Sequence, residues 1–495
     1  MKYISTRNNK ISVTAAEAIA KGISDEGGLF VPDTFKKLTE EDFKTLLKMD
    51  YKERAKFVLS PFLNDFTEEE VDYCVNGAYT GSFDDEQPAP LKKLSENAYS
   101  LELWHGPTCA FKDLALQILP YLLTTSAKKK SNGKKTVILV ATSGDTGKAA
   151  LEGFCDVKDT EIMVFYPNEG VSQMQKLQMA SQKGDNVHVC AIEGNFDDAQ
   201  TGVKKIFTDK QVKENLAQNN MQFSSANSIN WGRLAPQIVY YVSAYCDLVN
   251  KGENLKDGMN VVVPTGNFGN ILAAYYAKKM GVPINKLICA SNANNVLTDF
   301  INTGVYDRNR KFYTTYSPSM DILISSNLER MIFELSGNDS EVVEALQKDL
   351  AENGKYTVPA DIKAKIDELF FGGCCDDEGT LETIRKTFEN HNYLCDTHTA
   401  VAVNAYKKYV EKTGDNRPTV IASTASPYKF AKNVLAAISD EKVSGEFETV
   451  RLLSDLTNTT VPKPIVELEN AAVRFNDVCE KQDMLREVYK ALGVK

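Results

Sequence analysis

The sequence has no long hydrophobic run. No window of it approaches the roughly 20 apolar residues that are needed to cross a bilayer. Residues 1–8 also lack the apolar stretch of a secretory signal. We therefore expect a cytoplasmic protein without a membrane partner.

Metal-ligand spacings are missing as well. The ten cysteines are scattered, no C-x-x-C pair occurs, and the only close pair is Cys374 and Cys375. The four histidines do not have the spacing of zinc ligands. We therefore expect reduced thiols and no metal site.

Basic residues form no large block and are outnumbered. The chain has 57 Lys and Arg against 67 Asp and Glu, a net charge of −10, which disfavours nucleic acid as a partner. Apolar residues make up 43% and charged residues 25% of the chain, as is typical of globular proteins. A length of 495 residues predicts two or three domains.

Short apolar strands alternate with amphipathic helices in most of the chain. The predicted strands cover 136–141, 161–166, 187–192, 260–263, 286–290 and 419–423. Strands that are apolar on both faces predict an α/β fold, in which helices cover both faces of parallel sheets. We expect an N-terminal domain at 1–90 and two parallel-sheet lobes at 91–250 and 251–495. Residues 340–390 are predicted to be a charged helical surface insertion, residues 470–492 a closing helix, and the protein a monomer.

Two glycine-containing turns follow predicted strands directly and precede helices. The first is Thr142-Ser143-Gly144-Asp145-Thr146-Gly147, and the second is Thr265-Gly266-Asn267-Phe268-Gly269-Asn270. Glycine lets the backbone approach a ligand, and the helix that follows directs free N–H groups at it. Either turn alone could bind nothing, but two in one chain favour a site for an anionic ligand.

Neither turn has the spacing of a nucleotide-binding motif. Gly144 and Gly147 are too close together for a P-loop, and Ala149 stands where a hydroxyl would bind magnesium. Gly266 and Gly269 lack the third glycine of a dinucleotide-binding turn. Nucleotide binding is therefore disfavoured.

A third motif is His105-Gly106-Pro107-Thr108-Cys109-Ala110-Phe111-Lys112-Asp113. It places Lys112 in the first turn of a predicted helix, where a cation is unfavourable. In an apolar pocket this amine would lose its proton more easily and become nucleophilic. Taken alone, Lys112 could be an ordinary surface lysine. Beside two anion-binding turns, it suggests a lysine that holds a phosphate-bearing aldehyde cofactor.

These motifs resemble those of the threonine synthases, which are pyridoxal-phosphate enzymes of fold type II. The resemblance rests on H-G-P-T-x-A-F-K-D, A-T-S-G-D-T-G, P-T-G-N-F-G-N and A-S-T-A-S-P-x-K-F, and it extends to residues 3–7 and 25–32. The resemblance covers nearly the whole chain, and the length of the chain makes it similar to the long fungal and enterobacterial branch of the family. It implies pyridoxal 5'-phosphate as the cofactor and a threonine-synthase-type domain at 1–90.

The resemblance also implies roles for individual residues. Lys112 would hold the cofactor covalently and move protons, while Gly266, Asn267, Phe268, Gly269 and Asn270 would bind its phosphate. Thr424 would face the pyridine nitrogen, an assignment that Ser423 and Ser426 compete for. The substrate carboxylate would lie against Thr142, Ser143, Gly144, Asp145 and Thr146. The charge of Asp145 there requires either a cationic partner or a proton.

Other polar residues remain ambiguous in the sequence. Arg233, at a helix start, could bind a substrate phosphate or form a surface ion pair. Lys176 and Arg330 are weaker candidates of the same type. We expect His105 and His398 to be structural.

The reaction that the resemblance implies converts O-phospho-L-homoserine and water to L-threonine and phosphate. Three alternatives stay open. A threonine-synthase-like phospho-lyase would release 2-oxobutyrate, ammonia and phosphate. A serine or threonine dehydratase would act on an unphosphorylated substrate. A catalytically silent binding module would retain the turns without the chemistry.

Overall fold

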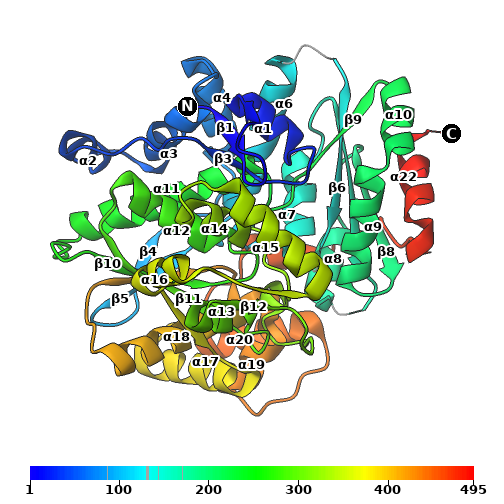
Figure 1. Cartoon of the computed structure of the whole chain (residues 1–495). Helices are drawn as coiled ribbons and strands as arrows, with labels where there is room; N and C mark the ends of the chain where they lie inside the picture. The colour runs from blue at the N-terminus through cyan, green and yellow to red at the C-terminus, as the bar shows by residue number, and fades with distance from the viewer. Residues whose placement is uncertain (86, 130–132, 143, 170, 495) are drawn as a thin grey trace.

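The protein folds into two helix-covered sheets, with an N-terminal domain packed above the larger sheet and beside the smaller lobe (Figure 1). The computed structural model describes residues 1–85, 87–129, 133–142, 144–169 and 171–494. Among these residues, no helix is both long and apolar enough to span a membrane. Within the same ranges, no group of three His, Cys, Asp or Glu side chains is arranged to hold a metal ion.

The larger sheet has six strands, which are parallel except for the outermost strand β4. In spatial order they are β14 (Phe370–Cys374), β11 (Ile284–Ser291), β10 (Met259–Pro264), β15 (Thr419–Ser423), β5 (Ala98–Glu102) and β4 (Leu91–Lys93). Strand β10 is buried along its whole length because helices cover both faces.

Two groups of helices sandwich this sheet (Figure 1). Helices α11, α12 and α13 pack on one face and α18 on the other, with α17 and α19–α21 outside α18. Their bounds are α11 (Trp231–Asn250), α12 (Gly269–Met280), α13 (Val296–Thr303), α17 (Asp377–His391), α18 (Thr397–Thr413), α19 (Ala431–Ile438), α20 (Glu446–Thr457) and α21 (Lys463–Leu468). The first turns of α12 and α18 thereby come to the edge of the sheet that faces the smaller lobe.

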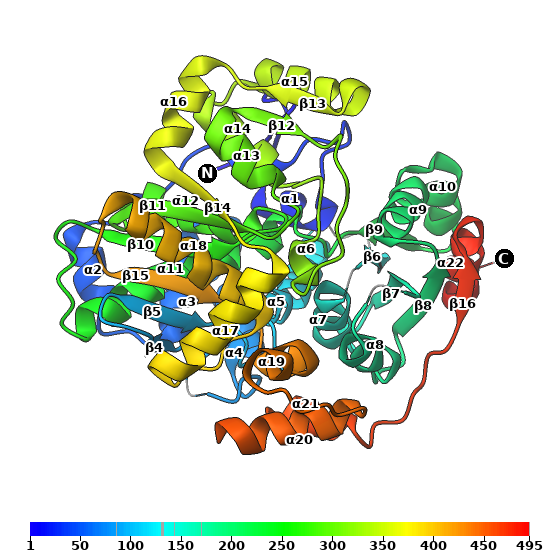
Figure 2. The same cartoon turned by 90° about the horizontal axis from the view of Figure 1, so that it is seen from below.

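The smaller sheet has five parallel strands and lies beside the larger one (Figure 2). In spatial order they are β16 (Val478–Glu480), β8 (Val187–Glu193), β7 (Thr160–Pro167), β6 (Lys135–Ala141) and β9 (Met221–Ser224). Helices α7 and α8 cover one face, and α9, α10 and α22 cover the other. The helices of this lobe are α5 (Lys112–Leu116), α6 (Leu119–Lys129), α7 (Asp145–Phe154), α8 (Gln173–Ala180), α9 (Phe196–Thr208), α10 (Lys210–Gln218) and α22 (Met484–Leu492). The prediction of two parallel-sheet lobes with helices on both faces is confirmed.

The N-terminal domain packs through apolar and aromatic side chains onto α11 and α12. Tyr3 and Phe62 both contact the ring of Trp231, and Phe35 stacks on Tyr276. Its elements are β1 (Tyr3–Ser5), β2 (Ser12–Val13), α1 (Ala15–Lys21), β3 (Phe30–Pro32), α2 (Glu40–Leu46), α3 (Tyr51–Leu59) and α4 (Glu68–Tyr79). Four of its helices begin at Thr or Asp residues that cap the first turn, each with an acidic residue three positions later.

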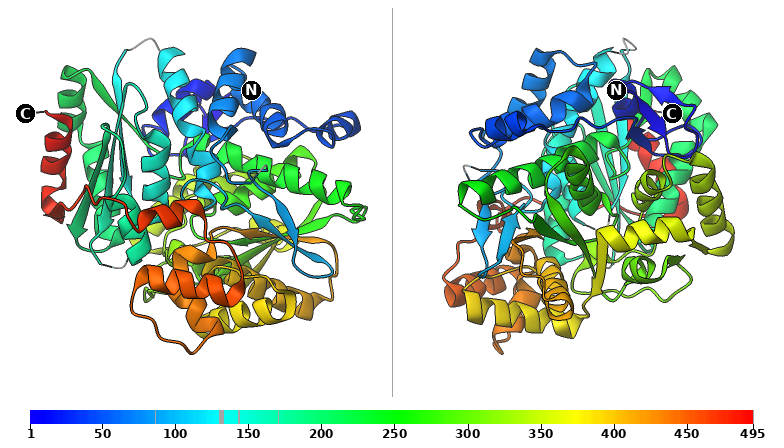
Figure 3. Two further views of the ribbon diagram at one scale, coloured as in Figure 1. Left: turned by 180° about the vertical axis from the view of Figure 1, so that it is seen from behind. Right: turned by 60° about the vertical axis from the view of Figure 1, so that its left-hand side comes forward.

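The two lobes do not divide the chain simply at residue 250, because each lobe contains a strand from beyond its expected segment. Strands β4 and β5 precede the smaller lobe in sequence but pair within the larger sheet. Strand β16 follows the larger lobe but pairs with β8. Figure 3 shows the C-terminal segment as it crosses from α21 to α22 on the far side of the smaller lobe. Each sheet is therefore completed by a segment from a distant part of the sequence.

Two expectations about secondary structure are wrong. Residues 470–492 are not one helix, because Val478–Glu480 forms strand β16 and only α22 (Met484–Leu492) is helical. The 340–390 insertion is not entirely on the surface. The segment contains the helices α15 (Ser340–Asn353), α16 (Ala360–Leu369) and α17. Between α16 and α17 lies strand β14, which forms the edge of the larger sheet. A Cβ at Gly372 would lie 3.1 Å from the backbone of Thr298, so glycine at this position allows β14 to pack closely against α13.

Candidate active site

A cavity of about 880 Å³ lies between the two lobes and the N-terminal domain. Lys112, Arg233 and Thr424 line it, as do all five residues of the turn 266–270. The turn after β6 contributes Thr142, Asp145 and Thr146, whereas Ser143 lies outside the described residues. Gly144 is described but is not among the residues that line the cavity. The structure otherwise brings together the described residues predicted from both turns and the lysine that the sequence singled out.

The turn 265–270 leads from β10 into α12. Phe268 has φ of 62°, which directs the chain sharply into the helix. A Cβ at Gly266 would lie 2.7 Å from the backbone oxygen of Ser319, so only glycine fits there. The side chain of Asn327 donates to the backbone oxygen of Asn267 at 3.0 Å and holds the turn in place. The first N–H groups of α12 therefore meet the cavity on a fixed backbone.

Asn270 leaves a buried donor without a partner in this turn. Its Oδ1 accepts a hydrogen bond from the hydroxyl of Tyr241, but its Nδ2 has no partner among the described residues. The residue is 8% exposed and lines the cavity. A buried N–H without an acceptor is costly, so this atom marks a place for an acceptor from a ligand.

Lys112 projects into the cavity from the first turn of α5. The residue is 9% exposed, and its Nζ lies 3.5 Å from Oδ2 of Asp145. Burial lowers the pKa of the amine, and the charges of Lys429 and Arg233 lower it further, against the opposing charge of Asp145. The amine is therefore disposed to be neutral and nucleophilic.

Asp145 has cationic partners in place of a proton. Lys429 Nζ lies 2.7 Å from its Oδ1, and Gln175 donates to the same oxygen at 2.8 Å. Burial raises the pKa of this carboxyl, but the charge of Lys429, together with that of Lys112 whenever its amine is protonated, outweighs burial and holds the pKa well below its usual range. The question that the sequence left open at Asp145 is answered by an ion pair.

Arg233 also lines the cavity, at the start of α11. It is 3% exposed, its Nη1 donates to the backbone oxygen of Ala226 at 2.6 Å, and its Nε has no partner among the described residues. No carboxylate of the described residues pairs with it, and desolvation lowers its pKa to about 10. A buried guanidinium without a counter-charge is a strong candidate for binding an anion.

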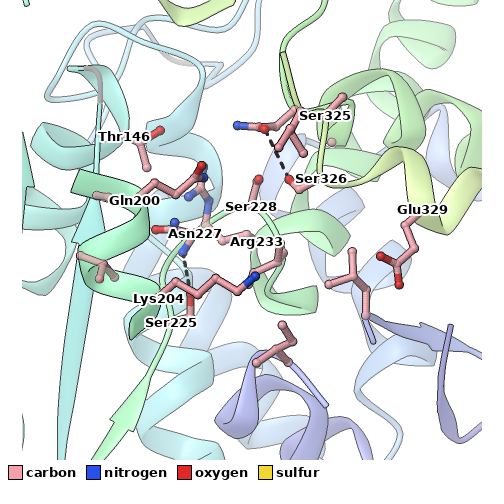
Figure 4. Close-up of a pocket in the computed structure, with 18 of the residues that line it drawn as sticks. Thr146, Gln200, Lys204, Ser225, Asn227, Ser228, Arg233, Ser325, Ser326 and Glu329 are labelled. Carbon is pink, nitrogen blue, oxygen red and sulfur yellow. Dashed lines mark hydrogen bonds between the residues drawn. The ribbon is translucent and has the colours of Figure 1, made fainter. Parts of the chain in front are cut away.

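Several polar side chains that the sequence did not single out surround Arg233 (Figure 4). Gln200 and Lys204 extend from α9, and Ser225, Asn227 and Ser228 lie on the loop before α11. Exposed lysines on amphipathic helices are common, so no sequence signal separates Lys204 from its neighbours. These residues come together only because α9 lies next to the start of α11 in the folded structure.

Of the three hydroxyls at the end of β15 and in the turn after it, those of Ser423, Thr424 and Ser426, only that of Thr424 belongs to a residue that lines the cavity. Ser423 accepts hydrogen bonds from Trp104 Nε1 and Thr399 Oγ1, each at 3.1 Å. Ser426 caps the short helix Pro427–Phe430 by accepting from the backbone of Tyr428. The other two hydroxyls are thus engaged in holding the fold.

The ambiguous residues have well-defined surroundings. His105 lies between Asp84 and Glu102, at 2.7 and 2.9 Å. His398 lines the cavity, and its two ring nitrogens contact the carboxylate of Asp396 and the backbone N–H of Ser319.

Two other candidate cations lie away from the cavity. Lys176 donates to Asn168, outside the cavity. The buried Arg330 donates to the backbone oxygens of Phe30 and Ile229, joining the N-terminal domain to the loop before α11. Both have protein partners in place of a ligand.

Comparison with known proteins agrees with this geometry. The family model "Threonine synthase N terminus" matches residues 2–79, "Pyridoxal-phosphate dependent enzyme" matches 84–359, and "Threonine synthase, C-terminal" matches 399–488. The threonine synthase of Pseudomonas aeruginosa is 37% identical, over 88% of this chain and 90% of that protein. The chain belongs to the threonine synthase family. The family consists of pyridoxal-phosphate-dependent lyases, and its cofactor is pyridoxal phosphate.

Two further relatives of this threonine synthase family member bear on its fold and length. The crystal structure of a pyridoxal-phosphate-bound threonine synthase from Brucella melitensis superposes with a TM-score of 0.88 at 35% identity, over 100% of both chains. Human threonine synthase-like 1 is 40% identical over 89% of this chain. The chain spans only 61% of the length of that protein.

The cavity suits the family's cofactor on its own chemistry. It offers a buried amine, the N-terminus of α12 and the unpartnered Nδ2 of Asn270, which match an aldehyde and a phosphate. The glycine at 266 keeps the turn close to Ser319, where no side chain would fit. The residues present therefore fit the cofactor.

Proposed function

We propose that this chain converts O-phospho-L-homoserine and water to L-threonine and phosphate. The observation that carries the proposal is Arg233, a buried guanidinium at the cavity wall with no carboxylate partner among the described residues. The substrate has a carboxylate and a phosphate at opposite ends. A dehydratase that acts on an unphosphorylated substrate would have no phosphate for the Arg233 guanidinium to bind.

The cofactor would be held by Lys112, Thr424 and the turn of Gly266, Asn267, Phe268, Gly269 and Asn270. When bound, it supplies an acceptor for the electron pair that is left when a substrate C–H bond is broken. Thr424 would offer its hydroxyl to the ring nitrogen. A neutral hydroxyl there leaves that nitrogen unprotonated and moderates its pull on electrons.

The substrate would lie between the two sides of the cavity. Its carboxylate would meet the turn of Thr142, Ser143, Gly144, Asp145 and Thr146 at the N-terminus of α7. The two N–H groups of Gly144 and Gly147 donate to Oγ1 of Thr142 and keep this turn closed. The phosphate would meet Arg233, a bidentate donor suited to its oxygens.

Lys112 would carry the protons of the reaction. Its neutral amine would take the proton from Cα of the substrate and return one there before the product leaves. The site must exclude stray water until the phosphate has left, because early hydrolysis would divert the product. The N-terminal domain, which contributes Arg7, Ser24 and Leu29 to the cavity wall, would serve as the cover.

The test is an assay of phosphate release from O-phospho-L-homoserine, with threonine and 2-oxobutyrate measured in the same samples. Equal amounts of phosphate and threonine support the proposal. Phosphate with 2-oxobutyrate and ammonia would identify the phospho-lyase. Turnover of serine or threonine without phosphate release would identify a dehydratase. The absence of any turnover would leave a silent binding module.

We also propose that the protein acts as a cytoplasmic monomer on this small molecule, without nucleic acid or membrane partners. The domain at 1–90 would act as one unit. The segments 91–250 and 251–495 would carry the lysine with the substrate carboxylate turn and the phosphate turn, respectively. Gel filtration with light scattering tests the oligomeric state, and a tetramer or dimer would overturn this part.

A further inference from the structure

Lys429 belongs to the A-S-P-x-K-F motif, but the proposed chemistry gives it no role. It lies on the short helix Pro427–Phe430, directly after the turn that contains Thr424. Its side chain is fully buried, with an exposed fraction of 0%. A buried ammonium is expensive unless it is paired and hydrogen-bonded, so its partners indicate its purpose.

The amine of Lys429 makes two contacts. Nζ lies 2.7 Å from Oδ1 of Asp145 and donates to the backbone oxygen of Thr108 at 2.9 Å. Thr108 lies in the same motif as Lys112, four residues before it. Lys429 therefore ties together the segment before Lys112 and the first residue of α7.

Asp145 is held rigidly by contacts to both of its oxygens. Oδ1 accepts from Lys429 and from Gln175 Nε2, while Oδ2 accepts from Ser319 Oγ at 3.0 Å. The same Oδ2 lies 3.5 Å from Nζ of Lys112. The carboxylate thus has one oxygen committed to Lys429 and the other turned toward the reactive amine.

The charges around Lys112 come from three elements. Asp145 on α7 favours the ammonium form of Lys112. Lys429, on the short helix Pro427–Phe430, and Arg233, on α11, both disfavour that form. His398 from α18 also lines the cavity, but it contacts Ser319 and Asp396. Without Lys429, the full charge of Asp145 would act on Lys112 alone and hold a proton on it.

We propose that Lys429 is a positioning residue that partly neutralises Asp145 and so keeps the amine of Lys112 uncharged. It acts through Asp145 and touches neither the substrate nor the reacting atoms. The inference rests on the proposed role of Lys112 as the amine that reacts with the cofactor. It concerns the proton on that amine, whichever product the enzyme releases.

The test follows the rate at which the full-length protein, stripped of cofactor, takes up pyridoxal phosphate at pH values from 6 to 10. Covalent uptake requires a neutral amine, so the midpoint of this profile reports the titration of Lys112. For Lys429→Met we expect the midpoint to rise by about one pH unit, which corresponds to ~10-fold less neutral amine at a fixed lower pH. Lys429→Arg keeps the charge and should keep the midpoint of the wild type.

A matched control is Lys148→Met. Lys148 is another buried lysine, 9% exposed, but it lies on α7, pairs with Glu152 at 2.9 Å and does not line the cavity. Its loss should lower stability and leave the midpoint unchanged. A Lys429→Met protein that is destabilised but retains the wild-type midpoint would show that Lys429 is only structural, and would overturn the inference.

If Lys429→Met does not fold, the double variant Asp145→Asn/Lys429→Met removes both charges and leaves no unpaired ion. Its midpoint should fall below that of the wild type, because the closest anion to Lys112 is gone. An unchanged midpoint would overturn the inference. The profile needs no turnover, so a wild-type protein that fails the phosphate-release assay refutes the proposed function without touching this result.

Discussion

The proposed reaction depends on Lys112, whose amine is buried at the cavity wall. Replacing it with alanine removes the only proposed carrier of the substrate proton. We expect Lys112→Ala to lower kcat by at least ~10³-fold and to abolish the absorbance of covalently bound cofactor. Lys176→Ala, which removes a lysine outside the cavity, should change neither quantity. Full activity of Lys112→Ala would rule out its proposed role.

In the proposed function, Arg233 is the residue that distinguishes a phosphorylated substrate from an unphosphorylated one. Arg233→Met removes a charge-assisted contact while preserving an apolar stem in the buried space. We expect kcat/KM for O-phospho-L-homoserine to fall by about 10–100-fold and inhibition by inorganic phosphate to weaken. Arg417→Met, at an ion pair with Asp415, serves as the control for losing an arginine. Equal kinetics of the Arg233 variant and wild type would contradict a phosphate site there.

His105 makes stability depend on pH in the alkaline range. Burial lowers its pKa, but hydrogen bonds to Asp84 and Glu102 outweigh burial and raise the pKa to about 9 from an ordinary 6.5. Because the folded state binds the proton more tightly, this stabilisation is fully present below pH 6.5 and is lost as the pH rises through 9.

Urea unfolding of His105→Gln at several pH values checks this expectation. The deficit in the free energy of unfolding, relative to wild type, should be largest near pH 6 and should shrink by pH 9.5. His391→Gln, at an exposed site on α17, should show no such trend. A deficit of the same size at both pH values would mean that the charge of His105 does not matter.

At the level of elements, the turn between β10 and α12 contains two glycines that tolerate a side chain differently, Gly266 and Gly269. Gly266→Ala places a Cβ 2.7 Å from a backbone oxygen, so the turn must shift even without a ligand. The nearest atom to a Cβ at Gly269 is at 3.5 Å, an ordinary contact. We expect Gly266→Ala to lower the thermal stability of the cofactor-free protein, and Gly269→Ala to leave it within ±0.5 kcal/mol.

Both substitutions should weaken the binding of pyridoxal phosphate if this turn holds the phosphate. Calorimetry on the cofactor-free variants measures that loss separately from stability. Wild-type affinity in Gly269→Ala would place the phosphate elsewhere.

The sequence predicted the elements well wherever the pattern was long and local. The strands at 136–141, 187–192 and 419–423 match β6, β8 and β15 within one or two residues. The strands β14 and β16 were missed because each is short and contains glycine or charged residues. Their strand character comes from pairing with β11 and β8, which no local pattern encodes.

The candidate site was predicted in part for the same reason. Lys112 and the two turns stand in contiguous motifs, so the sequence could identify them. The ion pair between Lys429 and Asp145 joins residues that are far apart in the chain, and no local pattern indicates that these two side chains meet. Lys204 and Gln200 were not predicted because an exposed helix face looks the same in the sequence wherever it lies.

For the whole molecule, the C-terminal segment is a structural part of the smaller lobe. Met484 of α22 is 1% exposed and packs closely against Gly202 of α9. We expect Met484→Ala to destabilise the protein by about 2–5 kcal/mol, as measured by chemical unfolding. Arg486→Ala, on the solvent side of the same helix, should cost far less. Similar stabilities of the two variants would mean that α22 merely rests on the lobe.

The late pairing of β16 with β8 also affects how the protein is made. When the ribosome has finished β8, the strand that will cover its outer edge has not yet been synthesised, and it emerges only on the order of tens of seconds later. During that interval the nascent chain carries an open strand edge, which is a template for pairing with other chains. Slow passage through the second half of the message, or loss of its last codons, would therefore favour aggregation of a lobe whose own sequence is intact.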